Sequence, residues 1–338
     1  PLSQHGRIWT LYVDWVKDFG VAETTLSVFR RYLQIEPSAR EALIDYLEEI
    51  DEPAEAAKQL RLCLNDPHFT SPTGKTTHEM WIRLCALCAR HPAETSTLLD
   101  VDALIRSGIT RFAGEVGKLW CYLASFHARL GRFEMARGVY EQGMDSVMTI
   151  RDFSQIYEAY VKFEEALLTN KMGVFEQGGD EDNDDMEKLE HEINFLAARM
   201  DFLLEMRPVL LTAVHLRQNP NNCAEWLRRA FLLGKPKAVV DEDARANSGD
   251  GDGDGDGDGD GASLSTKLPS VIVLLEALGT VESLSASGRL SKLWLSLAWA
   301  FNGAKDTKSC RLTLQTATQV QYKTAEEAAS VWCAWAEW

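Results

Sequence analysis

Two cysteines and a histidine have the spacing that metal-binding and redox proteins use. Cys85-x-x-Cys88 is followed three residues later by His91. A structural zinc site needs a second ligand pair of similar spacing, and the sequence contains no other C-x-x-C. A thiol redox motif is expected after a strand, whereas these cysteines lie in a helical pattern that begins at Trp81. We therefore interpret both thiols as buried or half-buried core residues and predict no metal site.

A second tempting motif is the tetrapeptide Thr73-Gly74-Lys75-Thr76, which has the residues that end a phosphate-binding loop. That loop requires a glycine five residues before Gly74, where Phe69 stands, and no strand is predicted ahead of it. We therefore interpret the tetrapeptide as a connection between two helices and predict no nucleotide site.

Alternating glycine and aspartate over residues 249–261 has the appearance of the start of a calcium-binding loop. Such a loop closes with a glutamate at its twelfth position, and no frame of this run places an acid there. The seven histidines are scattered, and none stands beside a serine or cysteine in a recognisable nucleophile context. The sequence thus predicts no catalytic residue, no cofactor and no small-molecule substrate.

Basic residues are in excess between positions 207 and 237, where six bases face one acid, Glu225. One interpretation is contact with RNA or with an acidic partner. The other, which we favour, is that the bases are solvated residues near helix ends. The residues that would make the contact are Arg217, Arg228, Arg229, Lys235 and Lys237.

The elements that hold these residues must be helices, because the strongest regularity in the chain is a three-residue step of apolar residues. The pattern W-x-x-[YLW]-x-x-[FLW] keeps its side chains near one helix face. Most copies start 34 to 39 residues apart, and two gaps are 69 and 68 residues long. The first positions of the copies are Trp9, Leu43, Trp81, Trp120, Tyr157, Trp226, Trp294 and Trp332.

A second helix follows the first in each unit of the repeat. Val28, Val139 and Thr313 each stand nineteen residues after the tryptophan that opens their unit. Prolines fall between the periodic segments, and alternation of β-branched residues is nearly absent. Because one helix pair cannot bury its apolar face alone, the pairs must stack. The sequence predicts an all-α fold, a right-handed α-solenoid of about eight helix-pair repeats.

Two acidic low-complexity segments interrupt the repeats. Residues 176–187 contain seven acids and residues 249–261 contain six, with no base in either. Like charges repel and glycine resists order, so we predict disordered segments over 173–187 and 241–268. Repeats are then predicted over 1–172, 188–240 and 269–338. The fifth pair is completed by residues 188–206, and the last pair is truncated.

The net charge bears on which classes of partner the chain can bind. There are 35 basic and 51 acidic residues, which gives −16, and an acidic chain is a poor first guess for a nucleic-acid binder. The two acidic segments hold 13 of those acids, so the rest of the chain carries only −3. That distribution weakens the argument against nucleic acid.

Cysteine usage and hydropathy indicate the compartment. The seven cysteines are an odd number, and no Asn-x-Ser/Thr acceptor exists, which favours a reducing compartment. No apolar run is long enough for a membrane span, so we expect no membrane association. The last segment carries Trp332, Trp335 and Trp338 on one stripe. Because such a stripe needs a partner surface, we expect the chain to be a piece of a longer array.

These residues carry a resemblance to a known repeat family. The pairing of W-x-x-Y with A-R-x-[VI]-[YF]-E at a period near 37 resembles the HAT (half-a-TPR) repeat. Residues 7–15, 117–165 and 210–226 are similar to the Syf-one family of pre-mRNA splicing factors, called XPA-binding protein two in animals; the resemblance covers 1–240 and 289–338. The matching repeat positions, as packing residues, are Trp9, Tyr12, Trp120, Phe126, Ala136, Arg137, Tyr140, Glu141, Trp294 and Trp332. Trp81 and Tyr157 join them by their place in the repeat.

The chain departs from the family pattern in two places. The Gly-Asp segment has no expected counterpart, which puts the helix near 262–288 in doubt. The usual Ala-Arg pair is Cys310-Arg311 in the penultimate unit.

The resemblance implies a non-enzymatic nuclear scaffold of the spliceosome, in the Prp-nineteen-associated complex. It implies other spliceosomal proteins as partners: a crooked-neck-like HAT protein, Syf-type subunits and an aquarius-type helicase. It also implies a link to transcription-coupled DNA repair. Two alternatives stay open at this point. One is a HAT scaffold of another RNA-processing machine, for ribosomal RNA or 3′-end processing, and the other is direct RNA binding through the 207–237 basic zone.

Overall fold

The structure is a computed structural model that describes residues 6–66, 69–112, 114–177, 183–234 and 260–338. The side chains of residues 177, 183–185 and 260–268 are not described. The chain divides into two compact units. Unit 1 comprises Pro1–Val147 and Arg151–Phe163, and unit 2 comprises Met148–Ile150 and Glu164–Trp338.

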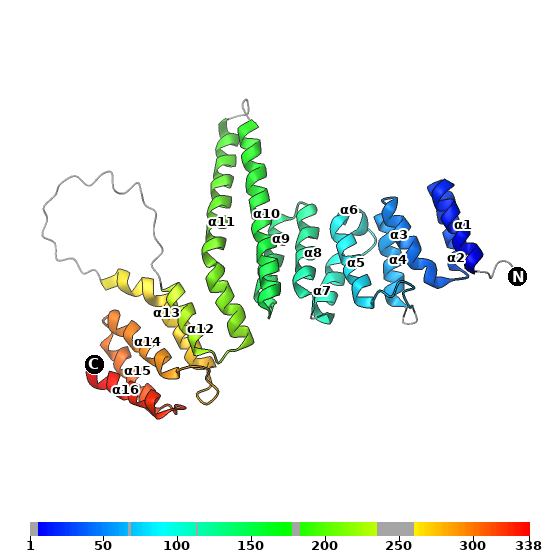
Figure 1. The fold of residues 1–338 in the computed structure, drawn as a ribbon. Coiled ribbons are helices and arrows are strands. Elements are labelled where there is room, and N and C mark those ends of the chain that lie inside the picture. Colours follow the sequence, from blue (N-terminus) through cyan, green and yellow to red (C-terminus); the bar gives the residue numbers. More distant parts are fainter. Residues whose placement is uncertain (1–5, 67–68, 113, 178–182, 235–259) are drawn as a thin grey trace. The chain divides into compact units, whose positions relative to one another are not determined.

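Unit 1 is a row of antiparallel helices in which each helix packs on its neighbours in the chain (Figure 1). The pairs are α1 with α2, α3 with α4, α5 with α7, and α8 with α9, and residues 151–163 of α10 follow. Its helices are α1 (Gly6–Phe19), α2 (Ala22–Leu33), the 3₁₀ turn η2 (Pro37–Ala39), α3 (Arg40–Glu49), α4 (Pro53–Asn65), α5 (Thr77–Arg90), α6 (Pro92–Thr95), α7 (Val101–Arg111), α8 (Val116–Arg129) and α9 (Phe133–Ser146).

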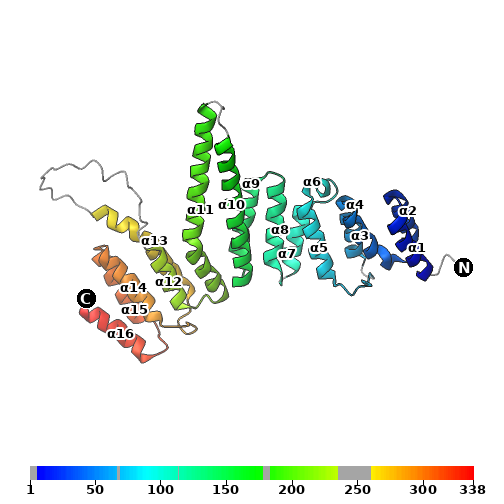
Figure 2. The same cartoon turned by 45° about the horizontal axis from the view of Figure 1, so that its top comes forward.

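Unit 2 continues the same kind of pairing. The end of α10 lies beside α11, α12 packs on α13, and α14 packs on both α15 and α16 (Figure 2). Its helices are α10 (Ile150–Gln177), of which residues 151–163 belong to unit 1, α11 (Asn183–Gln218), α12 (Cys223–Leu233), α13 (Asp260–Thr280), α14 (Leu290–Gly303), α15 (Thr307–Gln319) and α16 (Ala325–Glu337). A core of buried residues that includes Trp226, Leu274, Leu293 and Leu297 joins α12, α13 and α14.

The predicted all-α fold is confirmed. The described residues contain no strand, only an isolated bridge between Asn222 and Ser287. The eight residues predicted to open a repeat fall in eight different helices, which are α1, α3, α5, α8, α10, α12, α14 and α16. Among the helices that the structure describes, none combines the length and the hydropathy that a membrane crossing requires.

Local chemistry sets where several helices begin and end. Pro53 and Pro92 stand at the first position of α4 and α6, where proline has no hydrogen bond to lose. Thr76 and Glu79 form a capping box at the start of α5, with each side chain bonded to the other's backbone N–H. After α8, Gly131 adopts a φ of 74°, which reverses the chain before α9 and suits a glycine.

The helices differ from the predicted segments at the two acidic stretches. Helix α10 runs to Gln177 and α11 begins at Asn183, so both enter the stretch 173–187 that was predicted to be disordered. Likewise α13 begins at Asp260, inside the predicted segment 241–268. Glutamate is a good helix former, so acidic composition alone does not end a helix. The remainder of both segments, 178–182 and 241–259, lies outside the described residues.

Candidate functional site

Two tryptophans of unit 1 pack against glycines of the paired helix. Trp120 on α8 is 6% exposed, and a Cβ built on Gly143 of α9 would come 3.1 Å from its Cγ atom. Trp81 on α5 repeats the arrangement with Gly108 of α7, where a Cβ would come 2.5 Å from the indole nitrogen. The helices can approach this closely only because the glycines lack a side chain. These two tryptophans therefore serve the packing of helix pairs.

Arginines of α7 lie over the rings of the same indoles. The Arg106 guanidinium lies 5.8 Å from the Trp120 ring and Arg111 lies 5.9 Å from the Trp81 ring, both within cation–π range. Arg106 also pairs with Asp102 at 2.8 Å. The sequence pattern did not indicate these arginines, because they lie outside the tryptophan steps.

The A-R-G-V-Y-E segment of α9 makes specific contacts with its surroundings. Ala136 is fully buried, and Arg137 is buried and ion-paired with Glu134. Tyr140 stacks on Tyr160 of α10 with ring centroids 5.1 Å apart. The Tyr160 hydroxyl donates to a Glu141 carboxylate oxygen at 3.2 Å. The segment thus links α9 to the first half of α10.

The other predicted repeat positions vary in burial. Phe126 and Tyr157 are buried, and Trp9 is half-buried and stacked on Tyr32 at 5.7 Å. Trp294 is half-buried beside the unit 2 core. Tyr12 and Trp332 are largely exposed, at 45% and 60%. The repeat pattern thus predicts the helix that carries a residue better than it predicts burial.

The Thr73–Thr76 tetrapeptide lies between α4 and α5 and surrounds a buried carboxylate. Glu41 of α3 is 1% exposed and accepts hydrogen bonds at 2.6 Å from the hydroxyls of Ser71 and Thr73. Lys75 pairs with it at 2.7 Å. Burial opposes ionisation, but these partners lower the pKa of Glu41 to about 2. We call these four residues the Glu41 cluster; in it, the lysine of the motif binds a protein carboxylate.

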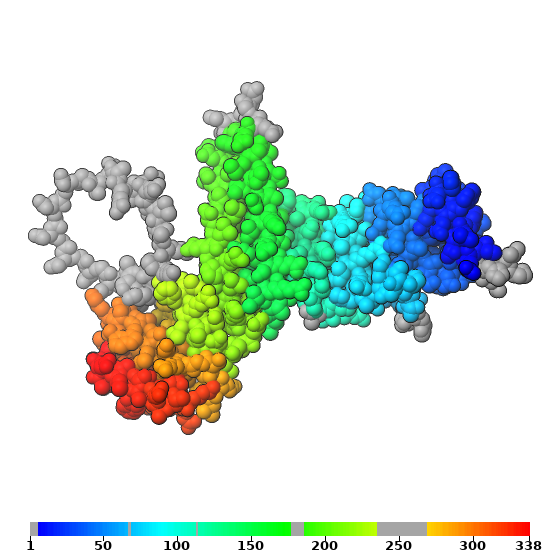
Figure 3. All heavy atoms as spheres, in the orientation of Figure 1, coloured from blue at the N-terminus to red at the C-terminus, as the bar shows by residue number. Residues whose placement is uncertain are grey.

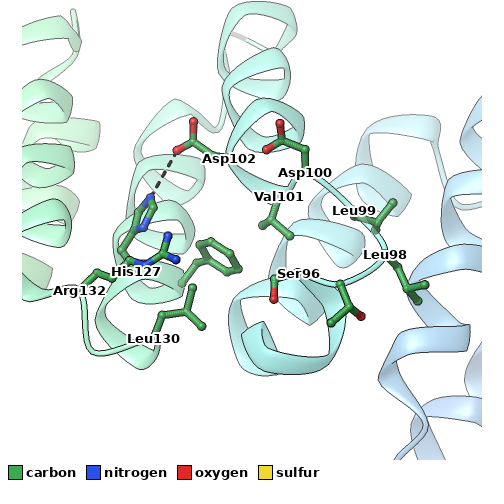
Figure 4. Close-up of a pocket in the computed structure, with 11 residues that line it drawn as sticks. Ser96, Leu98, Leu99, Asp100, Val101, Asp102, His127, Leu130 and Arg132 are labelled. Atoms are coloured by element: carbon green, nitrogen blue, oxygen red, sulfur yellow. Dashed lines mark hydrogen bonds and ion pairs between the residues drawn. The ribbon is translucent and has the colours of Figure 1, made fainter.

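A pocket of about 600 Å³ opens between the α6–α7 connection and the end of α8 (Figure 4). Leu99, Phe126 and Leu130 supply apolar wall, and Asp100, Asp102 and Arg132 supply charge. His127 is 4% exposed, and its Nε2 lies 3.3 Å from Asp102 Oδ1. Its Nδ1 has no hydrogen-bond partner among the described residues.

The pocket holds the residue types of a hydrolytic triad without the geometry. Ser96 lies across the pocket from His127 (Figure 4), and its hydroxyl donates to the Ala93 carbonyl at 3.3 Å. A triad needs the serine hydroxyl within hydrogen-bond reach of the histidine. The pair of His127 and Asp102 therefore joins α8 to α7 and has no nucleophile to activate here.

The cysteine pair is buried within α5. Cys85 and Cys88 have no exposed surface, and burial raises their pKa values to about 12 and about 11. The thiolate, which is the form that binds metal or attacks a disulfide, is thus disfavoured at neutral pH. Among the described residues, no three His, Cys, Asp or Glu side chains form a metal-binding group. Most of the Gly-Asp run lies outside those residues.

The basic zone is divided among different roles. Arg229 on α12 donates to the Val209 carbonyl of α11 at 3.2 Å, so it connects two helices. Arg228 has a 58% exposed side chain and lies 3.9 Å from Glu225, whereas Arg217 is half-buried on α11. Lys235 and Lys237 lie outside the described residues. RNA contact through this zone stays a prediction.

The helix pairs described above agree with the protein families that the chain matches. The family model for the middle HAT repeat of pre-mRNA-splicing factor SYF1 matches residues 40–246. The chain belongs to the SYF1 family of HAT-repeat proteins. A second model, for the C-terminal HAT repeat of Syf1/CRNKL1, matches residues 283–338. The SYF1 matches thus include α3 to α12 in one part and α14 to α16 in the other.

Curated members of the SYF1 family align with the whole chain. Pre-mRNA-splicing factor SYF1 of Homo sapiens is 35% identical over 98% of this chain, which covers 35% of that protein. The syf1 homolog of Drosophila melanogaster is 35% identical over 100% of the chain and 34% of its own length. Pre-mRNA-splicing factor cwf3 of Schizosaccharomyces pombe is 34% identical over 100% of the chain and 38% of its own length. The chain spans about a third of the length of these relatives.

Proposed function

We propose that this chain is a non-enzymatic HAT-repeat scaffold that acts in pre-mRNA splicing. The observation that carries the proposal is the alignment of 98–100% of this chain with about a third of each of several proteins named pre-mRNA-splicing factors, at 34–35% identity. The pocket geometry favours a binding role, since Ser96 is turned to a backbone carbonyl and His127 to Asp102. Stacked helix pairs offer long surfaces, so their function lies in holding other molecules.

The proposed partners are other proteins of the spliceosome, in the nucleus. More finely, we propose a place in the Prp-nineteen-associated complex, with a crooked-neck-like HAT protein, Syf-type subunits and an aquarius-type helicase as neighbours. A further role in transcription-coupled DNA repair belongs to the same proposal. Support for these finer statements comes from family membership alone, because the chain covers only part of each relative.

Affinity purification tests the proposal. The tagged chain is immobilised and incubated with nuclear extract, and the bound proteins are identified by mass spectrometry. We expect spliceosomal subunits, retained after ribonuclease treatment because the contacts are between proteins. Recovery of nucleolar or 3′-end cleavage factors in their place would favour a scaffold of another RNA-processing machine.

A matched control separates specific capture from adhesion to an acidic helical protein. The Trp120→Ala variant keeps the charge of the chain but removes a buried ring from the α8–α9 pair. If subunits are captured by the folded surface of unit 1, this variant recovers less of them. The parent chain and the variant could instead recover equal amounts, while circular dichroism shows that unit 1 of the variant is unfolded. That result would mean that unit 1 contributes nothing to the capture of spliceosomal subunits.

A further inference from the structure

Helix α11 is much longer than the helix that follows it. It has 36 residues against 11 in α12, about 54 Å against about 17 Å at 1.5 Å per residue. Arg229 of α12 donates hydrogen bonds to Val209 and Thr212, in the second half of α11. Figures 1 and 2 show α11 extending well beyond α12. Residues 183–204 of α11 lie ahead of these contacts.

Two phenylalanines lie on this part of α11. Phe195 is 63% exposed and Phe202 is 51% exposed. They are seven residues apart, two helical turns, so they share one face. The adjacent residues Leu196 and Leu203 are buried, at 9% and 7%, so the internal packing of α11 uses a different side. We call the exposed side the Phe195–Phe202 face.

Two ion pairs join helix α10 to α11. They engage two of the three basic residues between positions 164 and 206. Lys171 pairs with Glu192 at 2.6 Å, and Arg199 pairs with the buried Glu164 at 3.4 Å. These contacts join the two helices as a hairpin, and in the space-filling view the atoms of the second half of α10 and of α11 lie against each other (Figure 3).

The hairpin is rich in acidic residues. Residues 164–206 contain 13 acids and three bases, a net charge of −10 out of −16. Glu187, Asp201 and Glu205 are exposed and follow the same helix as the two phenylalanines. Exposed rings and exposed carboxylates on one helix favour a ligand that is both apolar and cationic.

We propose that the Phe195–Phe202 face docks a basic amphipathic helix from a partner protein. The apolar stripe of that helix covers the two rings, and its lysines and arginines lie toward the acidic residues, as in known helix-in-groove recognition. A second copy of this chain would bring two hairpins of −10 together, and phosphates of RNA or anionic lipid would be repelled. Charge therefore selects a basic protein segment. The inference deepens the proposed scaffold function and rests on it for the biological partner.

Peptide binding to the full chain tests the proposal. The probe is a fluorescein-labelled amphipathic helix of leucine and lysine, about 18 residues or five turns long. The matched peptide replaces every lysine with glutamate. We expect anisotropy to show binding of the basic peptide at least about tenfold tighter than the acidic one, weakening as salt rises from about 50 to 200 mM. Equal binding of both peptides would overturn the proposal.

Substitutions locate the binding face. Replacing both rings, Phe195→Ser with Phe202→Ser, is expected to weaken basic-peptide binding about tenfold or more, since buried aromatic anchors dominate such interfaces. The control is Leu204→Ser, on the same helix, 47% exposed and turned away from Phe202 by its two-residue offset. We expect it to change affinity less than about twofold. Affinity unchanged in the double variant, with helicity intact by circular dichroism, would refute the docking site.

One further outcome would also decide against it. Sedimentation that shows dimers of the chain, lost in the double variant, would assign the face to a second copy. The peptide assay contains no spliceosomal protein, so its failure leaves the scaffold proposal standing. Conversely, peptide binding without capture of spliceosomal subunits would remove the scaffold proposal alone.

Discussion

The ionisation of Glu41 is tied to folding. Its pKa is about 2 in the folded chain against an ordinary value of 4.5, because Lys75, Ser71 and Thr73 stabilise the carboxylate against the cost of burial. A lowered pKa means that the folded state binds the proton less well than the unfolded state. The cluster therefore contributes stability above pH 4.5, and that contribution is lost as the pH falls toward 2.

The variant Glu41→Gln tests this linkage. We expect the free energy of unfolding of unit 1 to fall by about 2–3 kcal/mol at neutral pH, because Lys75 loses its charged partner and a buried amide replaces it. The difference from the parent chain should shrink as the pH falls below 4.5. Urea unfolding at several pH values measures it. Glu49→Gln, exposed on the same helix, is the control, and a similar pH profile for both variants would contradict the account.

Glycine substitution separates packing from helix propensity. At Gly108 a Cβ would come 2.5 Å from the Trp81 indole nitrogen, so Gly108→Ala should destabilise unit 1 by about 1–3 kcal/mol. At Gly138, in the middle of α9, no atom lies within 4 Å of the added Cβ. Gly138→Ala should therefore stabilise by about 0.5–1 kcal/mol. Thermal unfolding of the two variants checks the opposite signs, and two shifts of the same sign would refute the packing argument.

Residue roles could be predicted from sequence only where they repeat. Trp81 and Trp120 belong to a regular step, so their place in a helix interface was predictable. The Glu41 cluster was not, because Glu41 is 30 or more residues from the other three members and the four show no periodicity. The motif around Lys75 was correctly interpreted as a connection between helices, but nothing in it indicates which carboxylate it meets.

At the scale of elements, the packing of α8 on α9 is stabilised by the indole ring of Trp120. Trp120 is 6% exposed and lies between Gly143 and Arg106, so Trp120→Ala should cost about 3–5 kcal/mol. Trp332, at 60% exposed on α16, offers the matched change, and Trp332→Ala should cost less than about 1 kcal/mol. Denaturant titration followed by circular dichroism compares them. An unchanged unfolding curve for Trp120→Ala would contradict the assignment of Trp120 as a packing residue of the repeat that α8 and α9 form.

Helix existence was predictable from the three-residue step, whereas helix length was not. The α10–α11 hairpin extends into the stretch that acidic composition predicts to be disordered, because local helix propensity decides where a helix ends. Likewise Arg229 belongs to a basic zone by composition but bonds a carbonyl of α11. Composition gives the charge of a segment. Which group each charged side chain bonds depends on the helices packed against it, and these appear only in the structure.

At the scale of the whole molecule, charge distribution limits nucleic-acid binding. Of the net charge of −16, residues 164–206 carry −10, while Arg229 in the basic zone is bonded to α11. We expect the chain to bind a single-stranded RNA of about 20 nucleotides more weakly than about 10⁻⁴ M at physiological salt. Fluorescence anisotropy measures it. Tight, steeply salt-dependent binding that weakens in Arg228→Ala with Arg229→Ala would reverse this conclusion.

The Glu41 cluster joins residues that are only 30 to 34 positions apart, and each helix pair likewise closes on its immediate neighbours in the chain. Contacts of such short separation form quickly, since little loop entropy must be lost first. A ribosome releasing this polypeptide would therefore expose a complete α3–α4–α5 group before α8 has been synthesised. Each buried tryptophan can then be covered within a pair or two of its own synthesis. Unfinished chains of this protein should consequently need little protection from chaperones during translation.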